Sequence, residues 1–295
     1  MSLGGGKRVV VGVDGSDEAV VAVRAATQDA ARRGCGLKLV HAFVWPELRI
    51  AVGPPQSGPP NAGLRNEAER LLADAAKVAS HTDPSVPVTA EILTGAAPRV
   101  LLHVAQEAEV IVIGTRGLGG FTGLLVGSTA VQVAAHSPVP VLAVRGDVRE
   151  QGSVVLGVNG APESKGAVAV GFSEAERRDA ELLAVHAWTG PVSTAPGDVQ
   201  PLVDDVDRIE GEETRVLSEA LSGYQTSHPD VTVVQRVVRR RAAPALIELS
   251  QTARLLVVGS RGRGGFKGLL LGSVSQQMLH HAGCPVLIVP RRAAA

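Results

Sequence analysis

The sequence predicts an α/β protein built from two copies of one domain, each with a parallel sheet between helices. First, the stretch 110–128, VIVIGTRGLGGFTGLLVGS, recurs at 255–273 as LLVVGSRGRGGFKGLLLGS. Second, short valine-rich runs alternate with helical patterns in both halves, which implies a parallel sheet. Third, 45% of residues are hydrophobic but only 2% are aromatic, which suits buried strands packed by small-residue helices.

The two halves align at a constant separation. The pairs that are 145 positions apart are Asp14 and Asn159, His41 and His186, Gly114 and Gly259, Gly127 and Gly272, and Pro140 and Pro285. Such a repeat indicates a tandem duplication, and 295 residues suit two domains of ordinary size. The polar stretch 146–152, GDVREQG, predicts the join, so we place the domains at 1–147 and 148–295.

The first half begins with a strand and a capped helix. The valine-rich run from Arg8 to Val13 predicts a buried strand. In the helix that follows, we expect Ser16 as the N-cap and Gly34 as the stop. Residues 37–44 form the second expected strand, and a Pro/Gly-rich loop at 46–60 then leads to a helix with apolar residues at helical spacing between 64 and 78.

Three further strands complete the predicted domain. We expect the third strand at 88–93, a short helix opened by Pro98 at its first position, and the fourth strand at 110–113. A glycine loop, a helix at 128–136 and a last strand at 139–144 follow. The second half repeats this order, with strands expected near Val154, Leu182, Val231, Leu255 and Pro285.

The repeated loop has a glycine spacing that suits anion binding. The spaced residues are Gly114, Gly117, Gly127 and Ser128 in the first copy, and Gly259, Gly262, Gly272 and Ser273 in the second. Glycines let a ligand approach the backbone, and free N–H groups at a helix start attract phosphate. We expect each serine at the helix cap, adding a hydroxyl donor. The alternative, a turn that only reverses the chain, stays open.

Two better-known phosphate loops are excluded. GxxxxGK[ST] is absent from both copies, and GxGxxG fails because Thr122 and Lys267 replace its last glycine. Parallel sheets bind ligands beyond the carboxyl ends of their strands, where the winding reverses. If the strand order is 3-2-1-4-5, Asp14 at the end of strand one and Gly114 at the end of strand four face each other across one crevice.

Both halves resemble the universal stress protein domain, and the whole chain resembles the tandem members found in actinobacteria. ATP-binding members of that family carry an aspartate at the end of strand one and a G-x2-G-x9-G-[ST] loop, and both halves match the loop. The resemblance implies flavodoxin-like or Rossmann-like domains, each a five-stranded parallel sheet in the order 3-2-1-4-5 with helices on both faces. It also implies that ATP with Mg²⁺ is bound and that the protein is a homodimer.

The resemblance assigns roles to particular residues. Asp14, with Asn159 at its place in the second half, would bond the ribose hydroxyls. The backbone at Ala42 or Ala187 would meet the adenine. Ribose and phosphates would be held by the glycine loops together with Ser128 and Thr129 in the first half, and Ser273 and Val274 in the second.

The second half departs from the family pattern at two positions. Asn159 replaces the aspartate and Ala161 replaces Ser16, and the loss of a charged acceptor costs about 1 kcal/mol or more. Arg263 and Lys267 stand where the first copy has Leu118 and Thr122, which adds two positive charges to the second loop. We therefore expect both sites to bind ATP.

Other features narrow the class of protein. The formal net charge is zero, which gives no bulk electrostatic case for nucleic acid or an anionic membrane. Cys35 and Cys284 fall at non-equivalent positions, so neither a disulfide framework nor a metal knuckle is indicated. No apolar stretch has the length of a membrane helix or a signal peptide, so we expect a cytoplasmic protein.

No catalytic constellation is present in the sequence. We interpret His41 and His186 as structural histidines of apolar strands. Arg116 and Arg261 either clamp phosphate or are simply solvated. The hypothesis is therefore an ATP-binding regulator of stress, hypoxic or dormant states, where the physiological part comes from the resemblance. The alternatives are a slow ATPase or adenylate-processing enzyme in the same pockets, and a scaffold that binds no nucleotide.

Overall fold

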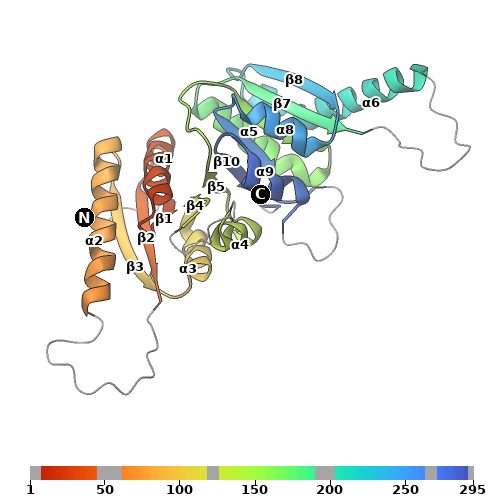
Figure 1. Cartoon of the computed structure of the whole chain (residues 1–295). Helices are drawn as coiled ribbons and strands as arrows, with labels where there is room; N and C mark the ends of the chain where they lie inside the picture. The colour runs from red at the N-terminus through yellow and green to blue at the C-terminus, as the bar shows by residue number, and fades with distance from the viewer. Residues whose placement is uncertain (1–7, 45–61, 118–125, 190–202, 263–270, 292–295) are drawn as a thin grey trace, which may run out of the picture. The chain divides into compact units, whose positions relative to one another are not determined.

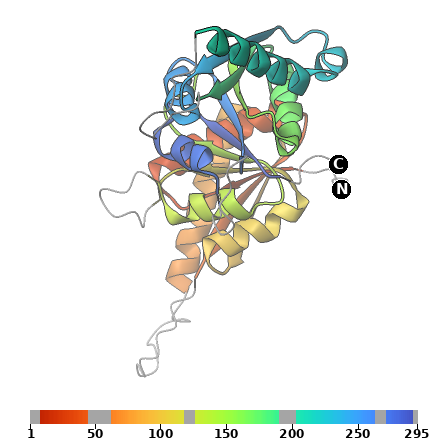
Figure 2. The ribbon, with the colours of Figure 1, turned by 90° about the vertical axis from the view of Figure 1, so that its right-hand side faces the viewer.

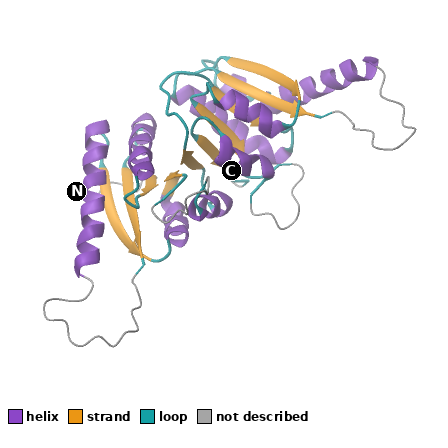
Figure 3. Ribbon diagram, in the orientation of Figure 1, coloured by secondary structure: helices purple, strands orange, loops and turns teal. Residues whose placement is uncertain are grey.

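The computed structural model describes residues 8–44, 62–117, 126–189, 203–262 and 271–291, and the chain divides into two compact units. The first unit ends at Val144 and the second begins at Arg145. Figure 3 shows that helices and strands alternate within each unit.

The first unit contains a five-stranded parallel sheet. Its strands are β1 (Arg8–Gly12), β2 (Leu37–Phe43), β3 (Val88–Thr94), β4 (Ala108–Gly114) and β5 (Val141–Val144). All neighbouring pairs are parallel, and they give the order β3-β2-β1-β4-β5. The expected order 3-2-1-4-5 is confirmed in this unit, so the winding reverses between β1 and β4.

The second unit repeats this arrangement. Its strands are β6 (Val154–Val158), β7 (Leu182–Trp188), β8 (Val233–Arg239), β9 (Leu255–Gly259) and β10 (Val286–Val289). The parallel pairs give the order β8-β7-β6-β9-β10, which is the same as that of the first unit. Here the winding reverses between β6 and β9.

Helices cover both faces of each sheet (Figures 1 and 2). In the first unit α1 (Asp17–Arg33) and α2 (Ala62–Thr82) share one face, while α3 (Ala97–Val104) and α4 (Ser128–His136) share the other. The second unit has α5 (Lys165–Arg177), α6 (Val203–Leu221) and α7 (Tyr224–Ser227) against α8 (Ala242–Ser250) and α9 (Ser273–His281). The sheets are close to these helices: a Cβ atom at Gly12 would lie 3.2 Å from Leu101 of α3, and one at Gly157 would lie 3.1 Å from Leu246 of α8.

Helix α1 begins and ends where the sequence predicts. Ser16 Oγ accepts a hydrogen bond from Ala19 N at 3.2 Å, and Gly34 has φ +62°, the left-handed conformation of a C-cap glycine. The last strands begin later than expected, at Val141 and Val286 rather than at Val139 and Pro285. The cause is local, because Pro140 and Pro285 have no N–H for a strand ladder.

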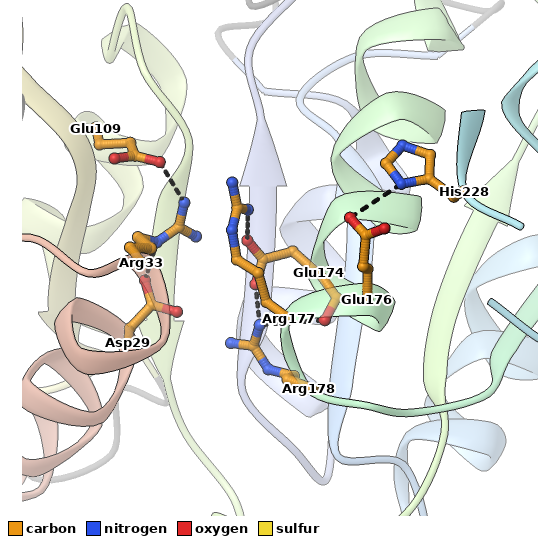
Figure 4. Close-up of polar contacts among 8 residues, drawn as sticks. All are labelled: Asp29, Arg33, Glu109, Glu174, Glu176, Arg177, Arg178 and His228. Carbon is orange, nitrogen blue, oxygen red and sulfur yellow. Dashed lines mark hydrogen bonds and ion pairs between the residues drawn. The ribbon is translucent and has the colours of Figure 1, made fainter. Parts of the chain in front are cut away.

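In each unit, charged side chains form ion pairs at the carboxyl-terminal end of the first helix (Figure 4). Arg33 is bound to Asp29 at 2.6 Å and to Glu109 at 2.9 Å, and its side chain is only 5% exposed. In the second unit Glu174 pairs with Arg177 at 3.1 Å and with Arg178. Buried ion pairs of this kind are costly to break from one side only, because the remaining charge stays desolvated.

The equivalent of Glu109 in the second unit has the opposite charge. Arg254 stands 145 positions later, and its Nη1 donates to the carbonyl of Arg178 at 2.7 Å. Burial, and then the neighbouring Arg178 charge, lower the pKa of the Arg254 guanidinium. The two units therefore share a backbone arrangement while differing in how the ends of α1 and α5 are tied to the sheet.

Candidate functional site

The end of β1 carries an oriented carboxylate. Asp14 lies two residues beyond the strand, and its Oδ1 accepts hydrogen bonds from Ser16 N at 3.0 Å and from Ser16 Oγ at 2.6 Å. Gly15 between them has φ +89°, a conformation that glycine adopts without strain. The turn therefore fixes one carboxylate oxygen and directs the group toward the carboxyl edge of the sheet.

The other carboxylate oxygen lies against the glycine loop. A Cβ atom at Gly117 would come closer than 3.0 Å to Oδ2 of Asp14, a distance that real Cβ atoms essentially never show. Asp14 follows β1 and Gly117 follows β4, and these strands are neighbours in the sheet. The structure therefore places the two sequence-predicted groups together at the point where the winding reverses.

The loop returns to the sheet at the start of α4. Gly127 N donates to the carbonyl of Thr115 at 2.8 Å, and Gly127 is the N-cap residue. The expectation that Ser128 occupies the cap is wrong, because Ser128 is the first helical residue and no side chain caps this helix. Exposed Ser128 and half-buried Thr129 lie in the first turn, where the helix leaves backbone N–H groups without helical partners.

The second unit repeats this geometry with an amide in place of the carboxylate. Asn159 Oδ1 accepts from Ala161 N at 3.0 Å, and a Cβ at Gly262 would lie 3.5 Å from Asn159 Nδ2. Gly272 N donates to the carbonyl of Ser260 at 2.8 Å. Gly272, not Ser273, is the cap of α9, so the expectation for this serine is wrong as well.

The loss of the Ser16 hydroxyl changes the start of the first helix. In the second unit Ala161 takes that place, and the 3-10 turn η2 (Pro162–Ser164) precedes α5, which begins only at Lys165. Ser164 Oγ donates to the carbonyl of Ala161 at 2.6 Å. Asn159 therefore lacks the hydroxyl neighbour that Asp14 has, and its side chain is oriented by a backbone donor.

The residues expected to meet the adenine lie at the same edge of each sheet. Ala42 is the penultimate residue of β2, and Ala187 is the penultimate residue of β7. Gly114 and Gly259 end β4 and β9. Since all these strands are parallel, their carboxyl ends gather at one edge within each unit.

The histidines of β2 and β7 have hydrogen-bond partners. His41 Nδ1 is 2.7 Å from the carbonyl of Val13, and His186 Nδ1 is 2.8 Å from the carbonyl of Val158. Each ring thus holds the residue that directly precedes Asp14 or Asn159. This supports the structural interpretation of both histidines and ties them to the site.

Two polar residues near the site were not predicted. Buried Ser275 donates from Oγ to the carbonyl of Gly259 at 2.6 Å, and Glu213 Oε2 lies 2.7 Å from His186 Nε2. Both signals were present in the sequence. Ser275 replaces Ala130 of the first copy, and Glu213 interrupts an otherwise apolar helix stripe.

One arginine in each glycine loop lies on the surface of the protein. Arg116 and Arg261 are exposed, while Leu118, Thr122, Arg263 and Lys267 lie outside the described residues. Over the part of the chain that the structure describes, no group of three or more His, Cys, Asp or Glu side chains could hold a metal ion. Within those same ranges, no helix has the length and apolar content to cross a membrane.

Fold and site together define a tandem pair of doubly wound α/β units, each with a glycine loop facing a polar side chain at the reversal point. The model of the universal stress protein family matches residues 6–145 and 152–290, so the chain belongs to that family. Universal stress protein Rv2005c of Mycobacterium tuberculosis is 36% identical over 95% of this chain and 96% of its own length.

A solved structure that matches nearly the whole chain shows the same fold. A universal stress protein from Archaeoglobus fulgidus has a TM-score of 0.69 and 18% identity, and the match covers 97% of both chains. A universal stress protein solved in complex with cAMP is 27% identical over 48% of this chain and 99% of its own, with a TM-score of 0.38. The similarity in fold rests on the Archaeoglobus fulgidus structure, because its match spans nearly the whole of both chains.

Proposed function

We propose that this protein binds ATP with Mg²⁺ at the carboxyl edge of each unit and acts as a nucleotide-dependent regulator. The observation that supports this proposal is the approach of Asp14 to Gly117, which Asn159 and Gly262 repeat in the second unit. A polar side chain beside a loop with no Cβ, at a helix start, suits a ribose hydroxyl next to a phosphate.

The chemistry favours binding over catalysis. Asp14 is already engaged by Ser16 through Oδ1, and a carboxylate that holds ribose is a poor general base for phosphoryl transfer. The regulatory role in stress, hypoxia or dormancy, a cytoplasmic location and a homodimer are proposed from the family membership. Light scattering at micromolar concentration tests the homodimer, and a strictly monomeric mass would reject it.

The decisive experiment identifies the ligand. Mass spectrometry of gently purified protein, followed by calorimetric titration with ATP and Mg²⁺, is expected to show an adenine nucleotide and two binding sites per chain. No binding at millimolar ATP would reject the proposal. Multiple turnover of ATP above the rate of a Gly117→Ala chain would instead favour a slow ATPase.

A further inference from the structure

Both ring nitrogens of His186 face hydrogen-bond acceptors. Nδ1 is 2.8 Å from the carbonyl oxygen of Val158, and Nε2 is 2.7 Å from Oε2 of Glu213. The His186 side chain is 3% exposed and that of Glu213 is 25% exposed. Water therefore has little access to the ring, and these two contacts define its hydrogen bonding.

The two contacts together require one extra proton. A neutral imidazole carries a single N–H, whereas a carbonyl and an ionised carboxylate can only accept. If Nδ1–H donates to Val158, then Nε2 meets Glu213 favourably only when the ring is an imidazolium or the carboxyl is protonated. The pair in its observed geometry thus holds one proton more than a neutral ring beside an ionised carboxylate.

This pair is connected to the candidate site by one residue. Val158 ends β6 and directly precedes Asn159, whose amide lies beside Gly262. The ring of His186 thus contacts the carbonyl of Val158, whose peptide bond leads directly to Asn159. Through Nε2, Glu213 on α6 is linked to the same strand end.

The first unit has the histidine without the acid. His41 Nδ1 is 2.7 Å from the carbonyl of Val13, which precedes Asp14. Ala68, which is 2% exposed, stands at the position equivalent to Glu213. The first unit therefore contains the strand tie but not the carboxylate that this position supplies in the second.

Glu213 is the acid in direct contact with the His186 ring. On α6 the less exposed positions of residues 206–221 are Val206, Ile209, Glu213, Val216, Leu217, Ala220 and Leu221, so Glu213 is the charged member of this inward stripe. The partners of His186 in the sheet, Val158 and Val237, are not titratable. The elements near this face also carry titratable or charged residues. Those on α5, α7 and β8 are Lys165, Glu174, Glu176, Arg177, Tyr224, Arg236 and Arg239.

Several of these groups have partners of their own. Glu174 pairs with Arg177, Glu176 pairs with His228, and Arg239 lies 5.6 Å from the ring centre of Trp188. Arg239 lies two positions beyond Val237 on β8 and is exposed. The direct 2.7 Å contact makes Glu213 the dominant neighbour.

We propose that His186 is a positioning residue of the second nucleotide site and that Glu213 makes its action pH-dependent. The inference rests on the proposed nucleotide binding. At low pH the shared proton supports both hydrogen bonds, and the end of β6 is held in place for the ligand. As the pH rises and this proton leaves, one bond is lost, so affinity at the second site falls while the first site lacks this response.

The test uses the full chain with Gly117→Ala to weaken the first site. ATP with Mg²⁺ is titrated calorimetrically between pH 6 and pH 9 in this background, in the same background with Glu213→Gln, and in a control with Glu212→Gln. The amide introduced by Glu213→Gln can donate an N–H to a neutral Nε2, which preserves both contacts at every pH. Glu212 neighbours Glu213 on α6, pairs with Arg208 and is 53% exposed, so it is a matched control.

The expected result is a loss of affinity on raising the pH that Glu213→Gln removes. We expect a several-fold fall, up to about tenfold, in the parent and in Glu212→Gln, as for the loss of one hydrogen bond. Effects of pH on ATP itself are common to all three chains. The same pH slope in Glu213→Gln, or no slope in the parent, would overturn the proposal.

A readout without ligand separates this proposal from the proposed function. Ring ¹⁵N NMR is expected to show the signature of two protonated nitrogens for His186 at pH 6, and a single Nδ1–H in Glu213→Gln. Equal protonation of the ring in both chains would overturn the shared proton. If the protonation differs as expected but no chain binds ATP, the proposed function fails and the positioning role falls with it.

Discussion

Oδ2 of Asp14 occupies the space that a side chain at Gly117 would need. A Cβ atom there would be closer than 3.0 Å to this oxygen, whereas the equivalent atom at Gly262 would lie 3.5 Å from Asn159 Nδ2, an ordinary contact. The two units thus have the same loop, but there is less space for a side chain at Gly117 than at Gly262. The difference makes the pair Gly117 and Gly262 a matched test of the site.

The first prediction is that alanine affects these two glycines unequally. Gly117→Ala has to displace the Asp14 carboxylate, so it is expected to weaken ATP binding at the first site by about tenfold or more, as for loss of a hydrogen bond to a charged group. Gly262→Ala is expected to change the second site only a few-fold, by narrowing the approach to the backbone. Calorimetry that resolves both sites checks this. Equal effects would favour a loop that only turns the chain.

The second prediction concerns the residue after the first strand of each unit. Asp14→Ala is expected to weaken the first site by more than tenfold, because hydrogen bonds to charged groups contribute about 1.5–3 kcal/mol. Asn159→Asp restores the charge, but repulsion from the phosphates offsets about 0.5 kcal/mol at 8 Å in water. A modest gain at the second site is therefore expected.

A fluorescent ATP analogue titrated into each single variant measures these effects. Asp14→Asn is the control, since it keeps the shape of the side chain and removes the charge. An unchanged affinity in Asp14→Ala, together with loss of binding in Gly127→Ala, would leave the glycine loop as the site and reject the ribose role of Asp14.

The strands and the tandem repeat could be predicted because they depend on local patterns, whereas the strand order is an expectation from the family resemblance. Valine-rich runs such as residues 9–11 mark buried strands, and the constant repeat spacing fixes how the two units align. The expectation that Asp14 and Gly114 face each other follows from that strand order, since residues that end adjacent parallel strands share an edge. The close approach of Asp14 to Gly117 is seen only in the structure.

The remaining features depend on atoms that are distant in sequence. Whether Gly127 or Ser128 caps α4 is decided by the backbone bond from Gly127 N to Thr115, which a cap preference cannot anticipate. Glu213 is a single acid in an apolar stripe, and its partner His186 is 27 residues away. The periodicity of α6 identifies the stripe but gives no indication of what the acid faces.

A third prediction compares two glycines that have nearly equal φ angles. Gly146 has φ +57° and Gly34 has φ +62°. A Cβ at Gly34 meets nothing within 4 Å, so Gly34→Ala is expected to cost only the left-handed conformation, about 1–2 kcal/mol. A Cβ at Gly146 would collide with the backbone of Gly283 and would lie 2.9 Å from Cys284 N.

Gly146→Ala is therefore expected to destabilise the second unit by clearly more than Gly34→Ala destabilises the first. Backbone atoms cannot swing aside, and Asp147 N also donates to the carbonyl of Gly283 at 3.0 Å, so the whole segment has to shift. Urea unfolding of both variants, followed by circular dichroism, measures the difference. Equal midpoints would show that this contact contributes little to stability.

The last prediction concerns pH and the buried thiol of Cys284. Burial raises the pKa of this thiol to about 12, from a value of 9.0 for the free side chain. Between these values the unfolded chain loses a proton that the folded chain keeps, so the free energy of unfolding is expected to fall as the pH rises through this range. Cys284→Ala removes the titrating group and is expected to flatten the decline, although the lost volume lowers stability at every pH. Thermal unfolding of both chains at pH 8, 9 and 10 checks this. Cys35→Ala is a comparison variant rather than a neutral control, because burial also raises the pKa of that half-buried thiol. Parallel declines in the parent and Cys284→Ala would show that other groups govern the alkaline loss of stability.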